Sequence, residues 1–185
     1  MPKLFVIGDT HFMHHNIIKY TGRDPEFEKQ VIANWNSVVG EDDMVIHLGD
    51  LSAGVKGRMQ ELYDKVNSLN GNRILIRGNH DHFSDGRYIN DMGFEAVYEY
   101  MIADDILFVH YPLEITSYSK PNEIKRINFY SDLVKQNNIK HVVHGHTHGR
   151  DTGIPGHFNC SVEQISMCPV ELDKLINKEN ICQIN

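Results

Sequence analysis

Five apolar segments of this chain end in the same way, and this repeated ending constrains the fold more than any other feature. In each, an apolar residue or a glycine is followed by a polar side chain that can bind a metal. The endings are Asp9-Thr10-His11, Asp50, Asn79-His80-Asp81, His110 and His146-Thr147-His148. Glycine precedes four of them and lets the backbone turn sharply. Because loops from separate strands converge at the carboxyl ends of α/β sheets, we expect these side chains to form one site.

The segments around these endings alternate between strand and helix patterns. Apolar runs predict buried strands at 3–9, 43–50, 73–81 and 139–149, and helical spacing predicts helices at 25–39, 55–71 and 122–137. Residues 94–112 contain two apolar runs joined at Asp104-Asp105, which predicts an antiparallel hairpin. The tail predicts a strand, a short helix and a final strand at 181–184. This order predicts an α/β domain with one mixed sheet or two packed sheets.

Composition narrows the class of protein. A chain of 185 residues fits one domain, over residues 1–185. The formal net charge of -7 argues against tracking along nucleic acid, which needs a basic face. Three cysteines without a CxxC pair disfavour a disulfide framework and exclude a thiolate zinc site. No segment has the length of a membrane span or the form of a signal peptide, so we expect a cytoplasmic protein without a membrane partner.

The donor atoms at the five endings predict a pair of transition metals. They are two carboxylates, one amide oxygen and four imidazoles: Asp9 and Asp50; Asn79; and His11, His110, His146 and His148. Mixed nitrogen and oxygen donors suit Mn, Fe, Zn, Ni or Co better than Ca or Mg. Seven donors exceed the needs of one tetrahedral ion, and a carboxylate can bridge two. Two divalent ions about 3.5–4 Å apart are a common device for hydrolysing phosphate esters.

The same residues, in the same order, resemble the signature of the calcineurin-like metallophosphoesterases. The resemblance is carried by Asp9-x-His11, Gly49-Asp50, Gly78-Asn79-His80-Asp81, His110 and Gly145-His146-x-His148. The stretches GDTHFMHHNII and RILIRGNHD further resemble a small, single-domain bacterial and phage branch of that family. Met13 departs from the pattern, since a small residue such as glycine is expected there.

The resemblance implies a fold, a ligand set and a mechanism. The fold is a four-layer α-β-β-α sandwich of two mixed β-sheets flanked by helices. Three residues are implied for a first metal, three for a second and one as a bridge: Asp9, His11 and His148; Asn79, His110 and His146; and Asp50. Manganese is the first choice of metal. A hydroxide bridging the ions would attack phosphorus, and His80, oriented by Asp81, would protonate the leaving oxygen or stabilise the transition state.

Other polar residues receive weaker assignments. We expect His14, Arg23 and Arg126 to contact the substrate. The polar stretch that follows His110 is expected to form a lid that sets specificity. His47 is expected to be a buried, hydrogen-bonded histidine that is not a ligand, and the same role is favoured for His144.

Three functions remain in competition. The favoured one is a dinuclear metal-dependent phosphoesterase that hydrolyses a phosphate ester, a phosphodiester of a small nucleotide-type substrate being preferred to a monoester. The first alternative is a metal-dependent nuclease acting on DNA or RNA, which the acidic balance disfavours. The second is a catalytically inactive binding module of the same fold, ranked last because every motif position is filled. The substrate, the native metal and the oligomeric state stay open.

Overall fold

The computed structural model describes residues 1–177 and contains two mixed β-sheets. The first sheet has the order β4 (Phe94–Tyr98), β3 (Asn72–Ile76), β2 (Met44–His47), β1 (Leu4–Ile7) and β9 (Val170–Glu171). Strands β1 to β4 are parallel, and β9 pairs with β1 in the antiparallel sense. Their runs of branched apolar residues suit parallel strands that are covered on both faces.

The second sheet is smaller and brings the later endings to the first. Its order is β5 (Met101–Ala103), β6 (Ile106–Phe108), β7 (His141–His144) and β8 (His157–Asn159). Only β5 and β6 are antiparallel; β6, β7 and β8 run parallel. Because parallel strands end at the same edge, the residues that follow β6 and β7 emerge together.

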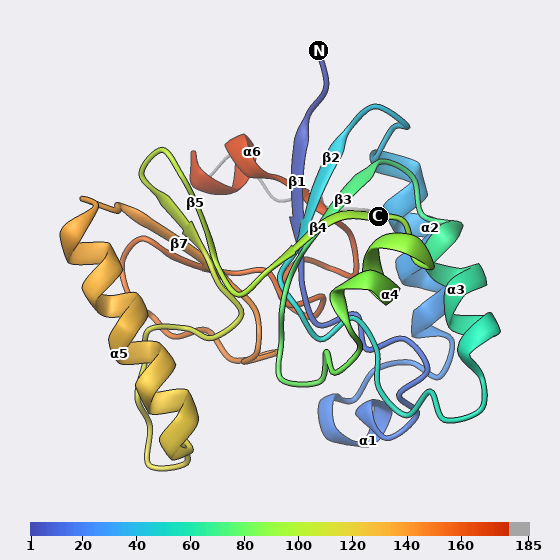
Figure 1. Cartoon of the computed structure of the whole chain (residues 1–185), viewed down its shortest axis with the longest axis horizontal. Coiled ribbons are helices and arrows are strands. Elements are labelled where there is room, and N and C mark those ends of the chain that lie inside the picture. The colour runs from blue at the N-terminus through green and yellow to red at the C-terminus, as the bar shows by residue number, and fades with distance from the viewer. Residues whose placement is uncertain (178–185) are drawn as a thin grey trace.

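Helices cover the outer face of each sheet (Figure 1). The helices are α1 (Ile17–Thr21), α2 (Phe27–Val38), α3 (Met59–Asn67), α4 (Asp85–Asn90), α5 (Pro121–Gln136) and α6 (Leu172–Ile176). Figure 1 shows α2, α3 and α4 beside the first sheet and α5 beside the second. The predicted α-β-β-α sandwich is therefore confirmed. No helix in the described part of the chain is long and apolar enough to cross a membrane.

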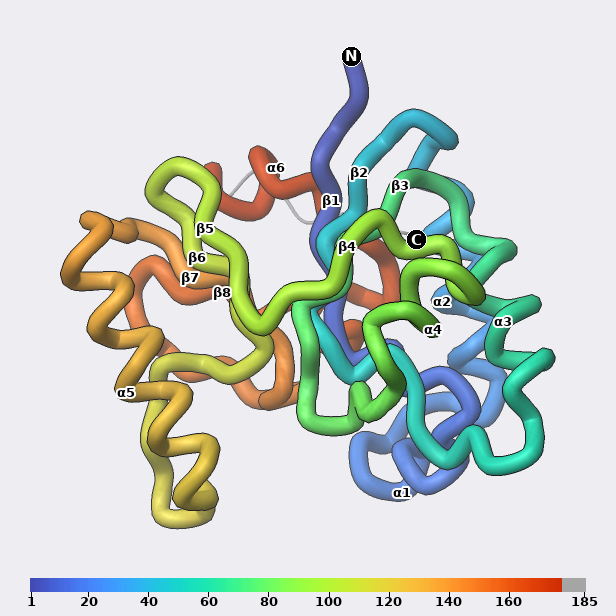
Figure 2. The backbone as a smooth tube through the Cα atoms, in the orientation of Figure 1, coloured from blue at the N-terminus to red at the C-terminus, as the bar shows by residue number. Residues whose placement is uncertain are grey.

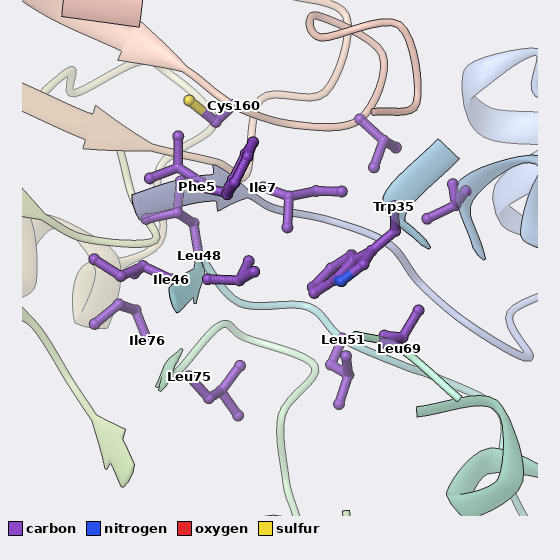
Figure 3. Close-up of a cluster of buried hydrophobic side chains, with 14 of the residues drawn as sticks. Phe5, Ile7, Trp35, Ile46, Leu48, Leu51, Leu69, Leu75, Ile76 and Cys160 are labelled. Atoms are coloured by element: carbon purple, nitrogen blue, oxygen red, sulfur yellow. The ribbon is translucent and has the colours of Figure 1, made fainter. Parts of the chain in front are cut away.

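Alternation along the strands explains how the core divides. Phe108 and Val143 belong to the large cluster that also contains the first sheet, whereas their neighbours Leu107 and Val142 pack in a second cluster with Ile127 of α5. Trp35 of α2 is fully buried on the helix side of the first sheet (Figure 3), and its indole N–H donates to the Asn70 carbonyl at 3.0 Å. The second sheet is thus held between the first sheet and α5.

Two predicted elements differ from those observed. The run at 94–103 is not one arm of a hairpin: β4 adds to β3 of the first sheet, and the chain then crosses to the second sheet, where β5 and β6 form the hairpin. Local apolar spacing cannot identify the sheet that a strand joins. Helix α3 starts at Met59 because Gly57 has a φ of 77°, outside the helical region. The predicted strand at 181–184 lies outside the described residues.

Candidate metal centre

The five endings meet because glycines let their backbones come into contact. Two backbone hydrogen bonds join the first two endings, from the Asp9 N–H to the Gly49 carbonyl and from the His11 N–H to the Asp50 carbonyl, both 2.9 Å long. A Cβ atom at Gly49 would lie 2.6 Å from the Gly78 nitrogen, closer than real Cβ atoms approach. Cβ atoms at Gly78 and Gly145 would overlap the carboxylates of Asp50 and Asp9. These positions therefore require glycine for close approach.

The backbone of the candidate ligands is held in a conformation that L-residues seldom adopt. Five of the seven have a positive φ: Asp9 (56°), His11 (49°), Asp50 (55°), His146 (70°) and His148 (48°). Each such residue costs of order 1–3 kcal/mol, and clusters of them are found at functional sites. Met13 also has a positive φ, of 70°, which accounts for the small residue expected there.

One set of donors, the first ligand group, consists of Asp9, His11 and His148. One donor atom of each lies within 4.8 Å of the others. The Nδ1 atom of His148 lies 3.2 Å from Oε1 of Glu163, which leaves Nε2 available for a metal. Among the described residues, Oδ1 of Asp9 and Nε2 of His11 are buried without a hydrogen-bond partner. Buried acceptors are seldom left unpaired, so these atoms fit a cation.

The second ligand group consists of Asn79, His110 and His146. His110 donates its Nδ1 hydrogen to the Leu48 carbonyl at 2.8 Å, so Nε2 is the ring nitrogen left to bind a metal. Nε2 lies 3.1 Å from Oδ1 of Asn79 and 3.2 Å from Nδ1 of His146. One oxygen and two nitrogen atoms that converge in this way suit a transition-metal ion.

Asp50 stands between the two groups. Its Oδ2 lies 3.4 Å from Nε2 of His11, and its Oδ1 lies 3.7 Å from Nε2 of His110. Burial, and then the charge of Asp81, raises the pKa of Asp50 to about 7; burial likewise raises the pKa of Asp9 to about 6. Ionised carboxylates are therefore costly here without positive charge nearby. The donor atoms and the raised carboxyl pKa values fit two divalent transition-metal ions. Asp50 lies at the position that a bridging ligand would occupy.

The structure identifies Glu163 as a supporting residue that the motifs did not reveal. Besides His148, its carboxylate accepts hydrogen bonds from Nε and Nη2 of Arg23 at 2.9 and 2.7 Å. Arg23 also donates to the carbonyls of Asp9 at 2.7 Å and Thr10 at 3.0 Å. The Arg23 side chain is fully buried, so it leaves no surface for the predicted substrate contact and instead fixes the first ending.

His47 and His144 are buried, as expected, and His47 joins the first two endings. The Gly49 N–H donates to its Nδ1 at 3.2 Å, so Nε2 carries the hydrogen and donates to the Thr10 hydroxyl at 3.0 Å. Burial lowers the pKa of His47 to about 3, which keeps the ring neutral. His144 places Nδ1 2.9 Å from the Gly145 carbonyl, beside the second ligand group.

The paired role predicted for His80 and Asp81 is only partly supported by their positions. The His80 side chain is exposed beside the first ligand group, its ring centroid 5.1 Å from that of His11. Asp81 does not orient that ring: among the described residues its carboxylate accepts from the amides of Asp50 (2.7 Å), Gly78 (2.8 Å) and Leu51 (3.1 Å) and from the Tyr88 hydroxyl. Four donors occupy both oxygens. Asp81 therefore links the second and third endings by hydrogen bonds.

Two cavities adjoin the metal centre. The α5-side cavity, of about 820 Å³, is lined by Asn79, His80, His146, Thr147 and residues between 111 and 123. The α1-side cavity, of about 630 Å³, is lined by His11, His14, His80, Thr147, His148 and part of α1. Segment 112–120 belongs to the predicted lid. It lines the α5-side cavity and runs alongside α5 (Figure 2).

Of the two remaining predicted substrate contacts, one lines a cavity and the other does not. His14 lines the α1-side cavity, and its Nδ1 is 3.2 Å from Nδ1 of His11. Arg126 is paired with Glu99 at 2.6 Å and is not among the lining residues of either cavity. Tyr111, which the motifs did not single out, lines the α5-side cavity, its ring centroid 4.6 Å from that of His146. Burial raises its pKa to about 12, so its hydroxyl stays a donor at neutral pH.

Comparisons with known proteins agree with this geometry. The family model described as calcineurin-like phosphoesterase matches residues 2–150. An uncharacterized protein of Methanocaldococcus jannaschii is 35% identical over an alignment of 196 positions that covers 98% of this chain and 95% of that protein. The Gene 66 protein of Mycobacterium phage L5 is 36% identical over 85 residues, 44% of this chain and 41% of that one.

Two solved structures share the fold. A protein of unknown function from Aquifex aeolicus superimposes with a TM-score of 0.82 at 27% identity, covering 96% of this chain and 99% of that chain. The nuclease MPE of Pseudomonas putida gives a TM-score of 0.50 at 19% identity, covering 78% of this chain and 61% of that chain. At this identity the second likeness bears on the fold alone.

Proposed function

The chain belongs to the calcineurin-like phosphoesterase family, and on this premise we propose that it is a dinuclear metal-dependent phosphodiesterase acting on a small, nucleotide-type substrate. The observation that carries the proposal is the convergence of Asn79 Oδ1 and His146 Nδ1 on Nε2 of His110, at 3.1 and 3.2 Å. One oxygen and two nitrogen donors at these distances suit a transition-metal ion. Manganese is the first candidate for both positions, with Fe, Zn, Ni or Co as the others.

The residues have separate tasks in this reaction. Asp9, His11 and His148 hold one ion and Asn79, His110 and His146 the other, with Asp50 shared. When bound, the ions supply a water of lowered pKa and neutralise charge on the phosphoryl oxygens. His80, exposed beside the first ligand group, protonates the leaving oxygen.

A nuclease is the second candidate, because a protein with this fold is named as one. The net charge of -7 weighs against it, since contact with many phosphates needs a basic surface. Single-stranded DNA or RNA bound with a steep dependence on salt would favour this alternative.

A hydrolysis panel in manganese tests the proposal. It compares aryl phosphomonoesters and diesters, cyclic nucleotides, dinucleotides and short oligonucleotides, each with and without a chelator. We expect chelator-sensitive hydrolysis of small diesters, well above that of monoesters and oligonucleotides. Hydrolysis that survives complete removal of metal, or that is confined to monoesters, contradicts the proposal.

A further inference from the structure

The two cavities meet across the metal centre. The α5-side cavity contacts the second ligand group through Asn79 and His146, and the α1-side cavity contacts the first through His11 and His148. His80 and Thr147 line both, so they mark the boundary between them. A third cavity, of about 290 Å³, borders His80 but none of the seven candidate ligands. A phosphate at the metals therefore has space for a substituent on each of two sides.

Both cavities are large enough for a ring-bearing substituent. Their volumes of about 820 and 630 Å³ fall within the range of about 300–1,000 Å³ that is usual for small-molecule sites. A phosphomonoester would fill one of them at most. Two cavities of this size match a phosphate with two organic arms.

The charges that line the cavities indicate arms without further phosphates. Among residues 1–177, no lysine, arginine, aspartate or glutamate lines the α1-side cavity. The α5-side cavity has two cations, Lys120 and Arg150, balanced by Glu114 and Glu123. Arg150 donates to Glu114 at 2.7 Å, which offsets its charge. A di- or polyphosphate arm would need a surplus of positive charge that neither cavity supplies.

Each cavity also has one strongly exposed tyrosine on its lining. Tyr118 is 91% exposed in the α5-side cavity, and Tyr20 of α1 is 75% exposed in the α1-side cavity. Exposed aromatic rings beside a phosphate site are suited to stacking on nucleobases, and such stacking tolerates any base.

We infer that the substrate is a dinucleoside monophosphate, with one nucleoside stacked on Tyr118 and the other on Tyr20. In the reaction the ester bond between phosphorus and the leaving oxygen breaks, a bond from phosphorus to a water oxygen forms, and a proton passes to the leaving oxygen. The products are one nucleoside and one nucleoside monophosphate. This inference rests on the proposed function and adds the nature of both arms.

Kinetics of tyrosine variants test the inference. Tyr20→Ala and Tyr118→Ala are compared with wild type in manganese, on adenylyl-adenosine and on methyl 4-nitrophenyl phosphate, which has no nucleoside arm. We expect each variant to lower kcat/KM for the dinucleoside about tenfold, mainly through KM. Hydrolysis of the methyl ester should change much less. Tyr20→Phe and Tyr118→Phe should retain wild-type values, because stacking does not use the hydroxyl.

The control variant is Tyr98→Ala, which removes a tyrosine that is 47% exposed on β4, outside both cavities. It should leave both substrates unaffected. Alanine variants that hydrolyse the dinucleoside like wild type overturn the inference. A diadenosine polyphosphate or an oligonucleotide cleaved tenfold better than the dinucleoside also overturns it. If the tyrosine variants overturn the inference but the methyl ester is still hydrolysed, the proposed function remains supported. If no diester is hydrolysed at all, both the inference and the proposed function are rejected.

Discussion

Asp50 places one carboxylate oxygen 3.4 Å from Nε2 of His11 and the other 3.7 Å from Nε2 of His110. One side chain thus reaches both ligand groups, each of which contains residues that follow strands of both sheets. The position of Asp50 at a φ of 55° is fixed by Asp81, which accepts its N–H, and by contact with Gly78. This geometry places Asp50 where one carboxylate could be shared by two metal ions.

Asp50→Asn should uncouple the metals. The amide keeps the shape but lacks the charge that a bridge between two cations needs. We expect bound manganese to fall from two ions to one or fewer per chain and kcat/KM for a diester to fall by at least about 100-fold. Metal analysis after gel filtration gives the stoichiometry. Two tightly bound ions in the variant would exclude the bridging role.

Glu163→Gln should weaken the first ligand group selectively. The carboxylate lies beside Nδ1 of His148 and accepts from Arg23, and loss of such a partner commonly costs about 10–100-fold in metal affinity. Manganese titration followed by electron paramagnetic resonance should show one weakened site and one unchanged site. Glu99→Gln, which breaks the surface pair with Arg126, is the matched control. Equal weakening of both sites would show that Glu163 acts on the whole fold.

Gly145→Ala should disrupt the site although it removes none of the candidate ligands. Its Cβ would overlap Oδ2 of Asp9, so the carboxylate or the loop must move. We expect metal affinity and kcat/KM to fall at least about tenfold, because ligands must be held within about half an ångström. At Gly149 a Cβ meets nothing within 4 Å, and Gly149→Ala should behave like wild type. Equal effects of the two substitutions would refute the packing argument.

His80 and Asp81 should respond differently to substitution. His80→Asn removes an exposed ring and should lower kcat with little change in thermal stability. Asp81→Ala leaves several buried N–H groups without their acceptor and should reduce the free energy of unfolding by about 2–4 kcal/mol. Chemical denaturation measures the difference. A normal stability for Asp81→Ala would restore its predicted role beside His80.

The stability of the metal-free protein should peak between about pH 6 and 7. Burial lowers the pKa of His47 and of His146 to about 3 from 6.5, so the unfolded chain binds more protons and stability falls as pH drops below 6.5. Burial raises the pKa of Asp9 to about 6 and of Asp50 to about 7 from 3.8, so the folded chain binds more protons and stability is lost as pH rises from 3.8 until it has passed those values. Above pH 6.5 the histidine contribution is complete and only this loss continues.

Thermal melts in a chelator across pH 4–9 check this dependence. Manganese binds ionised carboxylates and neutral imidazoles, so it should raise Tm more at pH 8 than at pH 6. A metal-free Tm that climbs steadily to pH 9 would contradict the raised carboxyl pKa values.

The sequence by itself determined the strand endings and therefore the ligand candidates. Gly-Asp, Gly-Asn-His-Asp and Gly-His-Thr-His each follow an apolar run, and chemistry alone indicated two metals from seven mixed donors. It also indicated most strands and helices, because apolar spacing is a local property. His47 lies within an apolar run, which predicts its burial, and the structure confirms it.

Tertiary structure alone decided which residues support those ligands. Glu163 lies 140 residues from Arg23 in the chain, and no local pattern links them. Asp81 adjoins His80 in sequence, yet its carboxylate turns to the amides of Asp50 and Leu51. Likewise, β4 belongs to the first sheet because it pairs with β3, which lies 18 or more residues earlier in the chain. Hydrogen-bond partners and strand neighbours depend on which segments meet in space, and that is set by packing of the whole chain.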